Sequence, residues 1–171
     1  MKKTILATCM LLVSLCAIAS NGIVITEGTT SFLREYETAN VVFNWNEATW
    51  DITLPLSEHW GSNSDSMKAA GKRYFVDGFN DTSKKLRIND NNGCKYRIEV
   101  HITNLSYFTS PLPFLTGYRH RVSGSITVVA NATNETVCVI FVDSFVGGRD
   151  TDFNDSYTEC MEDLGKKLAS L

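Results

Sequence analysis

The sequence lacks the features by which several functional classes are recognised. It has no excess of positive charge, since 16 Lys and Arg residues stand against 19 Asp and Glu residues in a chain of 171. No basic stripe compensates locally, so the electrostatic footprint of a nucleic-acid-binding protein is missing. Only three prolines are present, and no low-complexity stretch or internal repeat interrupts the chain. We therefore expect one domain without a linker.

Catalytic and metal-binding motifs are missing as well. No Gly-x-Ser-x-Gly turn or similar setting activates a serine or cysteine nucleophile. The cysteines show neither paired CxxC spacing nor alternation with histidine, which argues against a structural zinc site. His101 and His120 fall at positions predicted to face solvent and add no metal-ligand spacing. We expect no cofactor.

One long apolar run is present, and it lies at the start of the chain. Lys2 and Lys3 precede an almost unbroken apolar stretch, and Ala17-Ile18-Ala19 then supplies the small-x-small pattern that signal peptidase reads. These features predict that residues 1–19 are a removable signal peptide. Residues 20–171 would then form a single secreted or periplasmic domain. The run is too short to span a bilayer comfortably and has no later counterpart, so we expect no transmembrane segment in the mature chain.

Removal of this segment changes the charge and the cysteine content. Without its two lysines, 14 basic residues face 19 acidic ones, a net charge of −5. Bacterial lipoproteins carry a small residue before the acylated cysteine, whereas Leu15 precedes Cys16 here, which favours a soluble form over a lipoprotein. Cys94, Cys138 and Cys160 remain, and an odd set of three allows at most one internal disulfide.

Alternating apolar and polar residues predict a mainly antiparallel sheet. The best strands cover residues 96–103 and 121–130, which place one face toward the core and the other toward water. Residues 136–146 form a third strand that is apolar on both faces over Val137 to Val142, as in a central strand. Shorter strands are expected at residues 23–26 and 41–46, and a brief helical turn is expected at residues 31–36.

Two helices are expected, from about Ser64 and from about Asp152. Ser62 and Ser64 are competent N-caps for the first helix. Its apolar or small face comprises Met67, Ala70, Gly71, Tyr74, Phe75, Gly78 and Phe79. The stripe of the second comprises Phe153, Tyr157, Cys160, Met161, Leu164, Leu168 and Leu171. A sheet with one solvated face needs both helices on the other, which predicts an α+β fold: a two-layer sandwich of a mainly antiparallel sheet with two helices packed on one face.

Aromatic residues gather in two stretches that lack periodicity, residues 46–63 and 106–116. Trp50 and Trp60 lie in the first stretch, and Tyr107 and Phe108 in the second. Exposed aromatic side chains stack on glycan rings or anchor a protein partner, which makes these four residues the candidate binding site. Packing in the core is the alternative for the two tryptophans.

Two other groups of residues are candidate sites. Glu58 and His59 supply an acid and a base for a hydrolase. Asp150, Asp152 and Asn154 match the first three oxygen-ligand positions of an EF-hand loop, but the glycine and the bidentate glutamate that such a loop requires are missing. Acidic residues that open a helix explain this pattern more simply.

Five Asn-x-Ser/Thr sequons have two interpretations. In a eukaryotic secretory protein they would indicate glycosylation, whereas in an Asn-rich bacterial exoprotein they carry no meaning, and the short signal with its Lys-Lys start favours a bacterial protein. The sequons are at Asn80, Asn104, Asn131, Asn134 and Asn154.

The C-terminal part of the chain resembles a recurring exported bacterial domain. The resemblance covers roughly residues 64–171. It is carried by Gly124 to Ala130, Thr133 to Phe141, Gly147-Gly148 and the helix that ends in Leu164-Gly165-Lys166-Lys167-Leu168-Ala169. This pattern is similar to the periplasmic α/β domains of uncharacterised exported Bacteroidota proteins, and more distantly to the curli-secretion lipoprotein and TolB N-terminal domains.

The resemblance implies a non-enzymatic role in the envelope or outside the cell, with no catalytic residues. We therefore expect an exported binding or envelope-assembly accessory domain whose partner is an envelope protein or a glycan. The alternative is a secreted or periplasmic hydrolase that uses Glu58 and His59.

Overall fold

The computed structural model describes residues 22–91, 93–109, 117–150 and 152–171. The predicted signal peptide and Cys16 lie outside the described residues. The strands are β1 (Ile23–Gly28), β2 (Thr38–Asn44), β3 (Thr49–Trp50), β4 (Leu54–Pro55), β5 (Arg87–Ile88), β6 (Tyr96–Thr109), β7 (Tyr118–Ala130) and β8 (Glu135–Asp150). The helices are η1 (Ser31–Arg34), α2 (Leu56–Trp60), η2 (Gly61–Asn63), α3 (Ser64–Thr82) and α5 (Phe153–Ala169).

The sheet is mainly antiparallel, as the alternation predicts. The order of its main strands is β1-β8-β7-β6-β2-β5. The pairs β1–β8, β8–β7 and β7–β6 are antiparallel. β2 instead lies parallel to both β6 and β5. Strands that run parallel need a crossover connection, and α3 lies in the connection from β2 to β6.

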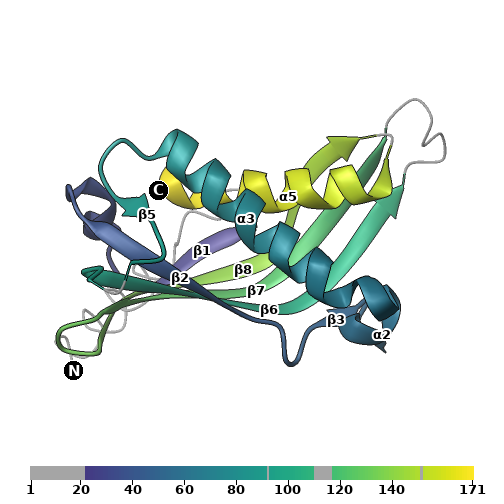
Figure 1. Ribbon diagram of the computed structural model, residues 1–171, viewed down its shortest axis with the longest axis horizontal. Helices are drawn as coiled ribbons and strands as arrows, with labels where there is room; N and C mark the ends of the chain where they lie inside the picture. The colour runs from purple at the N-terminus through teal and green to yellow at the C-terminus, as the bar shows by residue number, and fades with distance from the viewer. Residues whose placement is uncertain (1–21, 92, 110–116, 151) are drawn as a thin grey trace, which may run out of the picture.

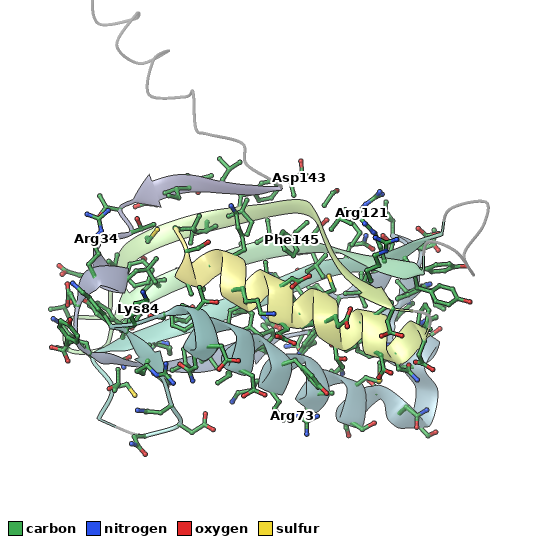
Figure 2. The ribbon with its side chains drawn as sticks, turned by 90° about the horizontal axis from the view of Figure 1, so that it is seen from above. Arg34, Arg73, Lys84, Arg121, Asp143 and Phe145 are labelled. Carbon is green, nitrogen blue, oxygen red and sulfur yellow. The ribbon has the colours of Figure 1, made fainter. Side chains whose placement is uncertain are left out.

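Both long helices lie on the same face of this sheet (Figure 1). Seen from above, α3 and α5 lie side by side over the sheet (Figure 2). Three glycines allow the helices to approach closely. A Cβ atom at Gly71, Gly78 or Gly165 would lie 2.1–2.2 Å from Tyr157 Oη, Glu162 O or Phe75 O, respectively. The fold is therefore the predicted two-layer α+β sandwich.

The register of the long strands follows the predicted alternation. Ile98 and Val100 are fully buried, whereas the Glu99 side chain is 45% exposed. β8 is central, between β1 and β7. Its outward apolar residues nevertheless remain accessible, and Phe141 is 49% exposed. The outer face of the sheet is thus partly apolar.

The structure corrects the expected limits of several elements. The stretch from residue 46 to 63 is not irregular, because β3, β4 and α2 form within it. β6 continues to Thr109, so Tyr107 and Phe108 belong to a strand that pairs with β7 beyond a register shift between Ile102 and Asn104. The N-cap of α3 is Asn63 rather than Ser62 or Ser64. The 3-10 turn η2 runs directly into α3 and leaves no extended residue in front of the helix.

Gly147 and Gly148 lie within β8 instead of ending it. A Cβ atom at Gly148 would stand 2.0 Å from the carbonyl oxygen of Ser156. The pair therefore lets α5 lie against the strand. On the open question of disulfides, Cys94, Cys138 and Cys160 are all free and buried.

Candidate functional site

α2 and β3 meet the sheet at one end of the molecule (Figure 1), and they contribute His59 and Trp50 to an aromatic cluster. Trp50 is its centre. The His59 ring stacks on Trp50 at 3.8 Å between ring centres with an interplanar angle of 5°. Tyr107 stacks on it at 5.8 Å, and Phe153 and His120 pack at 5.7 Å and 6.0 Å. Segments that are far apart in the sequence thus meet around one indole.

The candidate binding residues differ in their exposure. Trp50 and Trp60 are only 8% and 9% exposed, and both pack in the hydrophobic core. Trp60 packs edge-on against Tyr157 at 5.3 Å. Tyr107 is 49% exposed and forms the accessible edge of the cluster. The side chain of Phe108 lies outside the described part of the chain, and a binding role for these residues stays a prediction.

The β3–β4 hairpin carries further exposed apolar side chains beside the cluster. Ile52 at its tip is 79% exposed, and Leu54, which pairs with Trp50 across the hairpin, is 37% exposed. We call Ile52, Leu54 and Tyr107 the hairpin patch. Leu54 pairs with Trp50 across the hairpin, and the Tyr107 ring stacks on Trp50, so both exposed side chains lie next to the buried indole.

The hairpin holds Ile52 in an unfavourable backbone conformation. Its φ is 69°, in the left-handed region where a β-branched residue is a clear outlier. Asn104 fixes this geometry, since its Oδ1 accepts hydrogen bonds from Ile52 N at 2.8 Å and from Thr49 Oγ1 at 3.1 Å. Asp51 N also donates to Leu105 O at 2.8 Å. Local hydrogen bonds to β6 therefore maintain the strained tip.

His120 is a buried member of the cluster, which corrects its expected position on the solvent face. It is fully buried, and its Nδ1 lies 3.1 Å from Ser156 Oγ. Ser156 Oγ donates to Tyr118 O at 2.9 Å, so the histidine Nδ1–H is the donor in the other bond. Nε2 is then an acceptor that has no partner among the described residues.

The burial of His120 also changes its titration. Desolvation, together with the neighbouring charge of His59, lowers the pKa of His120 to about 4. The sequence did contain a signal for this burial: side chains two residues apart in a strand share a face, so His120 lies on the same inward face as Val122 and Gly124. Register shifts in β7 on both sides of His120 and Val122 obscure that signal.

The residues of the hydrolase alternative lie in the short helix α2. Glu58 and His59 are adjacent in α2, and neighbouring side chains of a helix diverge rather than face each other. Burial lowers the pKa of His59, but one face of its ring is covered by Trp50. Ser156 and His120 are both completely buried, and Ser156 Oγ–H is already donated to a carbonyl.

Two of the candidate metal ligands, Asp150 and Asp152, accept hydrogen bonds from backbone N–H groups at the start of α5. Asp152 is the N-cap of α5, and its side chain accepts hydrogen bonds from Asn154 N at 2.7 Å and Asp155 N at 3.2 Å. Asp150 Oδ1 accepts from Asp152 N at 2.8 Å. Within the described ranges, no three His, Cys, Asp or Glu residues are grouped to hold a metal ion.

Comparisons with known proteins give only remote structural likenesses. No protein-family model matches the sequence, and no curated protein matches it either. A PelC dodecamer from Paraburkholderia phytofirmans superposes with a TM-score of 0.48 at 11% identity, over 86% of this chain and 96% of that chain. A Xanthomonas campestris protein of the DUF330 family gives 0.40 at 8% identity, over 79% and 82%.

A neuraminyllactose-binding hemagglutinin homolog from Helicobacter pylori gives a TM-score of 0.36 at 8% identity, over 88% of this chain and 83% of that chain. These likenesses are too remote to indicate a function. The similarity to Bacteroidota, curli-secretion and TolB domains stays a prediction. In the part of the chain that is described, no helix has the length and apolar character needed to cross a membrane.

Proposed function

We propose that residues 20–171 form an exported, non-enzymatic domain that binds a partner protein through the hairpin patch. The observation that carries the proposal is Ile52, which is 79% exposed and held by Asn104 at a φ of 69°. Export rests on the predicted signal peptide. The partner would then be a protein of the envelope or of the exterior.

The strain at Ile52 supports a functional role for the hairpin. A left-handed conformation costs a residue other than glycine about 1–2 kcal/mol. Such a cost persists only where the surrounding structure over-determines the backbone, and strained residues cluster at sites of function. An isoleucine at this tip gains little from burial in the free protein, since most of its surface is exposed. Contact with a partner would supply that burial.

The chemistry of the patch favours a protein over a glycan or a membrane. Ile52 and Leu54 are aliphatic and offer no ring to stack on a sugar, although Tyr107 does. Exposed apolar patches on otherwise polar domains are typical of interaction surfaces. The predicted net charge of −5 disfavours an anionic lipid surface, which attracts basic segments.

Substitution of Ile52 by Asn tests the proposal without disturbing the hairpin. Asn tolerates the left-handed region, so the variant loses the apolar side chain and keeps the backbone. We expect the tagged protein to co-purify with one partner protein from its native host, and Ile52→Asn combined with Tyr107→Ala to lose that partner. Tyr36→Ala is the matched control, because Tyr36 is 80% exposed and lies outside the patch.

Equal recovery of the partner by the double variant and by the wild type would contradict the proposed surface. Recovery of a protease-resistant glycan in place of a protein would contradict the proposed class of partner.

A further inference from the structure

A polar pocket opens at the other end of the sheet, where β5 leaves the edge of β2. It has a volume of about 260 Å³ and is lined by Asn40, Val41, Asp90, Asn91, Arg97 and Asn131. Arg97 and Tyr107 both lie in β6, and ten residues of strand separate them by about 33 Å. The pocket is thus independent of the hairpin patch and of the proposed function.

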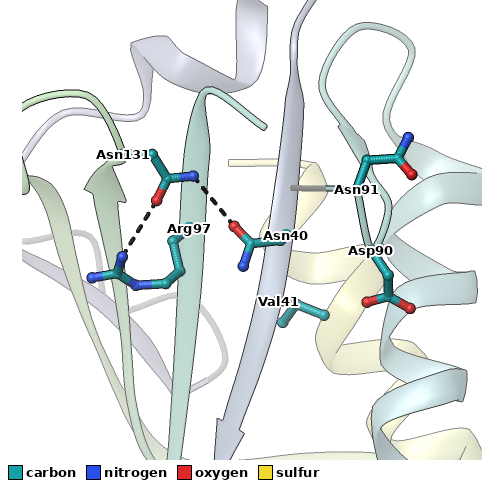
Figure 3. A pocket seen from close by; sticks show the side chains of 6 residues that line it. All are labelled: Asn40, Val41, Asp90, Asn91, Arg97 and Asn131. Atoms are coloured by element: carbon teal, nitrogen blue, oxygen red, sulfur yellow. Dashed lines mark hydrogen bonds between the residues drawn. The ribbon is translucent and has the colours of Figure 1, made fainter. Parts of the chain in front are cut away.

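A network of hydrogen bonds fixes the side chains on one wall of this pocket (Figure 3). Asn131 Nδ2 donates to Cys94 O at 2.7 Å and to Asn40 Oδ1 at 3.4 Å. Arg97 Nη1 donates to Asn131 Oδ1 at 3.3 Å, so Asn131 bridges Asn40 and Arg97. These hydrogen bonds fix the side chains of Asn40, Arg97 and Asn131 before a ligand arrives, which reduces the entropy that binding would cost.

The charges of the lining are compensated internally. Arg97 Nε donates to Glu99 Oε1 at 2.6 Å, and Arg97 Nη2 donates to Asn134 Oδ1 at 3.1 Å. Asp90 Oδ1 lies 3.4 Å from Lys72 Nζ. An anion would meet the Asp90 carboxylate and a cation would meet the Arg97 guanidinium. Neither kind of ion is therefore favoured in this pocket.

The remaining hydrogen-bonding capacity is mixed. A guanidinium has five N–H groups, and three of those in Arg97 are used, which leaves two donors. Asn40 contributes its amide N–H groups, Asp90 contributes acceptor oxygens, and Asn91 contributes both kinds. A hydroxyl group donates one hydrogen bond and accepts others, so a ligand that carries several neutral hydroxyls matches the lining of this pocket best.

We infer that this pocket binds a neutral saccharide ring, either free or as part of a glycan. The volume of 260 Å³ lies just below the range of about 300–1,000 Å³ typical of drug-sized ligands, which fits one or two sugar units.

Titration by nuclear magnetic resonance tests this inference. The protein comprising residues 20–171 is titrated with neutral di- and trisaccharides of hexose and N-acetylhexosamine, at millimolar concentrations. The same set with a uronic acid at one position serves as the charged comparison. We expect the neutral set to shift the side-chain amide signals of Asn40, Asn91 and Asn131, and the charged set to bind more weakly.

Variants assign the binding to the pocket. Asn40→Ala and Asn91→Ala each remove one set of hydrogen bonds, and each should weaken binding about three- to tenfold. Asn46→Ala is the matched control, because Asn46 is exposed and does not line the pocket. An absence of shifts with every neutral saccharide would overturn the inference. So would equal binding of the charged set, or binding that Tyr107→Ala abolishes and Asn40→Ala leaves unchanged.

Discussion

Val100 and Glu99 are neighbours in β6 with opposite surroundings. Val100 is 1% exposed, whereas the Glu99 side chain is 45% exposed and pairs with Arg97. Val100→Ala should lower the free energy of unfolding by about 1–3 kcal/mol, through lost burial and the cavity left behind. Glu99→Gln should lower it by less than about 1 kcal/mol, as expected for an exposed ion pair. Urea denaturation measures both, and a larger effect at Glu99 would place the register one residue away.

His120 makes the stability depend on pH. Its pKa is about 4 in the folded state and near 6.5 when it is unfolded, so the unfolded chain binds the proton more readily. The contribution of the neutral side chain is complete above pH 6.5 and is lost as the pH falls toward 4. The loss amounts to up to about 3 kcal/mol.

Urea denaturation at pH 7.5 and pH 4.5 checks this prediction. The decrease in stability between the two values should be smaller in His120→Phe than in the wild type. Ser156 keeps its hydrogen bond to Tyr118 O in that variant. The same decrease in both proteins would mean that His120 does not titrate as described.

Among the elements, the β3–β4 hairpin is destabilised by the left-handed backbone conformation of Ile52. Ile52→Gly removes the left-handed strain and adds some conformational entropy to the unfolded chain, for a net gain of up to about 1 kcal/mol in unfolding free energy. Val42→Gly is the control, because Val42 is 47% exposed in β2 and has no positive φ. We expect this variant to lose about 0.5–1 kcal/mol. A loss of stability in Ile52→Gly, measured by thermal unfolding, would show that the tip is not strained.

The contact between α3 and α5 depends on glycines that a helix would ordinarily disfavour. Alanine in place of glycine usually stabilises a helix by about 1 kcal/mol. At Gly78, however, a Cβ atom would lie 2.2 Å from the carbonyl oxygen of Glu162. We expect overpacking to dominate, so Gly78→Ala should lower the free energy of unfolding by about 1–3 kcal/mol.

Gly93→Ala provides the matched control for this substitution. No atom lies within 4 Å of a Cβ placed at Gly93. The control should change the stability by less than about 0.5 kcal/mol. A Gly78→Ala variant as stable as the wild type would show that the two helices are farther apart than described.

For the whole molecule, the sequence predicts the layers better than it predicts the connections. Period-two alternation in β6 and β7 and the apolar stripes of α3 and α5 are local patterns, and the two-layer sandwich follows from them. The parallel pairing of β2 with β6 depends on the path of a crossover, which no local pattern records. The extension of β6 to Thr109 is hidden by a register shift, which changes the alternation on which the prediction depends.

The sequence predicted which stretches of the chain contribute to the candidate site, but not which of their side chains are exposed. Sequence reasoning places Trp50, His59 and Tyr107 in two stretches without periodicity. Their convergence depends on the parallel pairing of the two-residue strand β3 with β6, which such short elements do not reveal. The burial of Trp50 follows from the same pairing, whereas Trp60 of α2 packs against Tyr157 of α5. The exposed part of the site is therefore Ile52, Leu54 and Tyr107, of which the sequence indicated only the tyrosine.

Site-specific photo-crosslinking tests the proposed binding surface most directly. A photoreactive phenylalanine analogue replaces Tyr107 in one variant and Tyr36 in another, and each protein is produced in its native host and irradiated. Both tyrosines are exposed, at 49% and 80%, but only Tyr107 belongs to the hairpin patch. We predict one defined protein adduct from position 107 that is absent from position 36 and is lost when Ile52→Asn is added. No adduct from position 107, or the same adduct from both positions, would contradict the account.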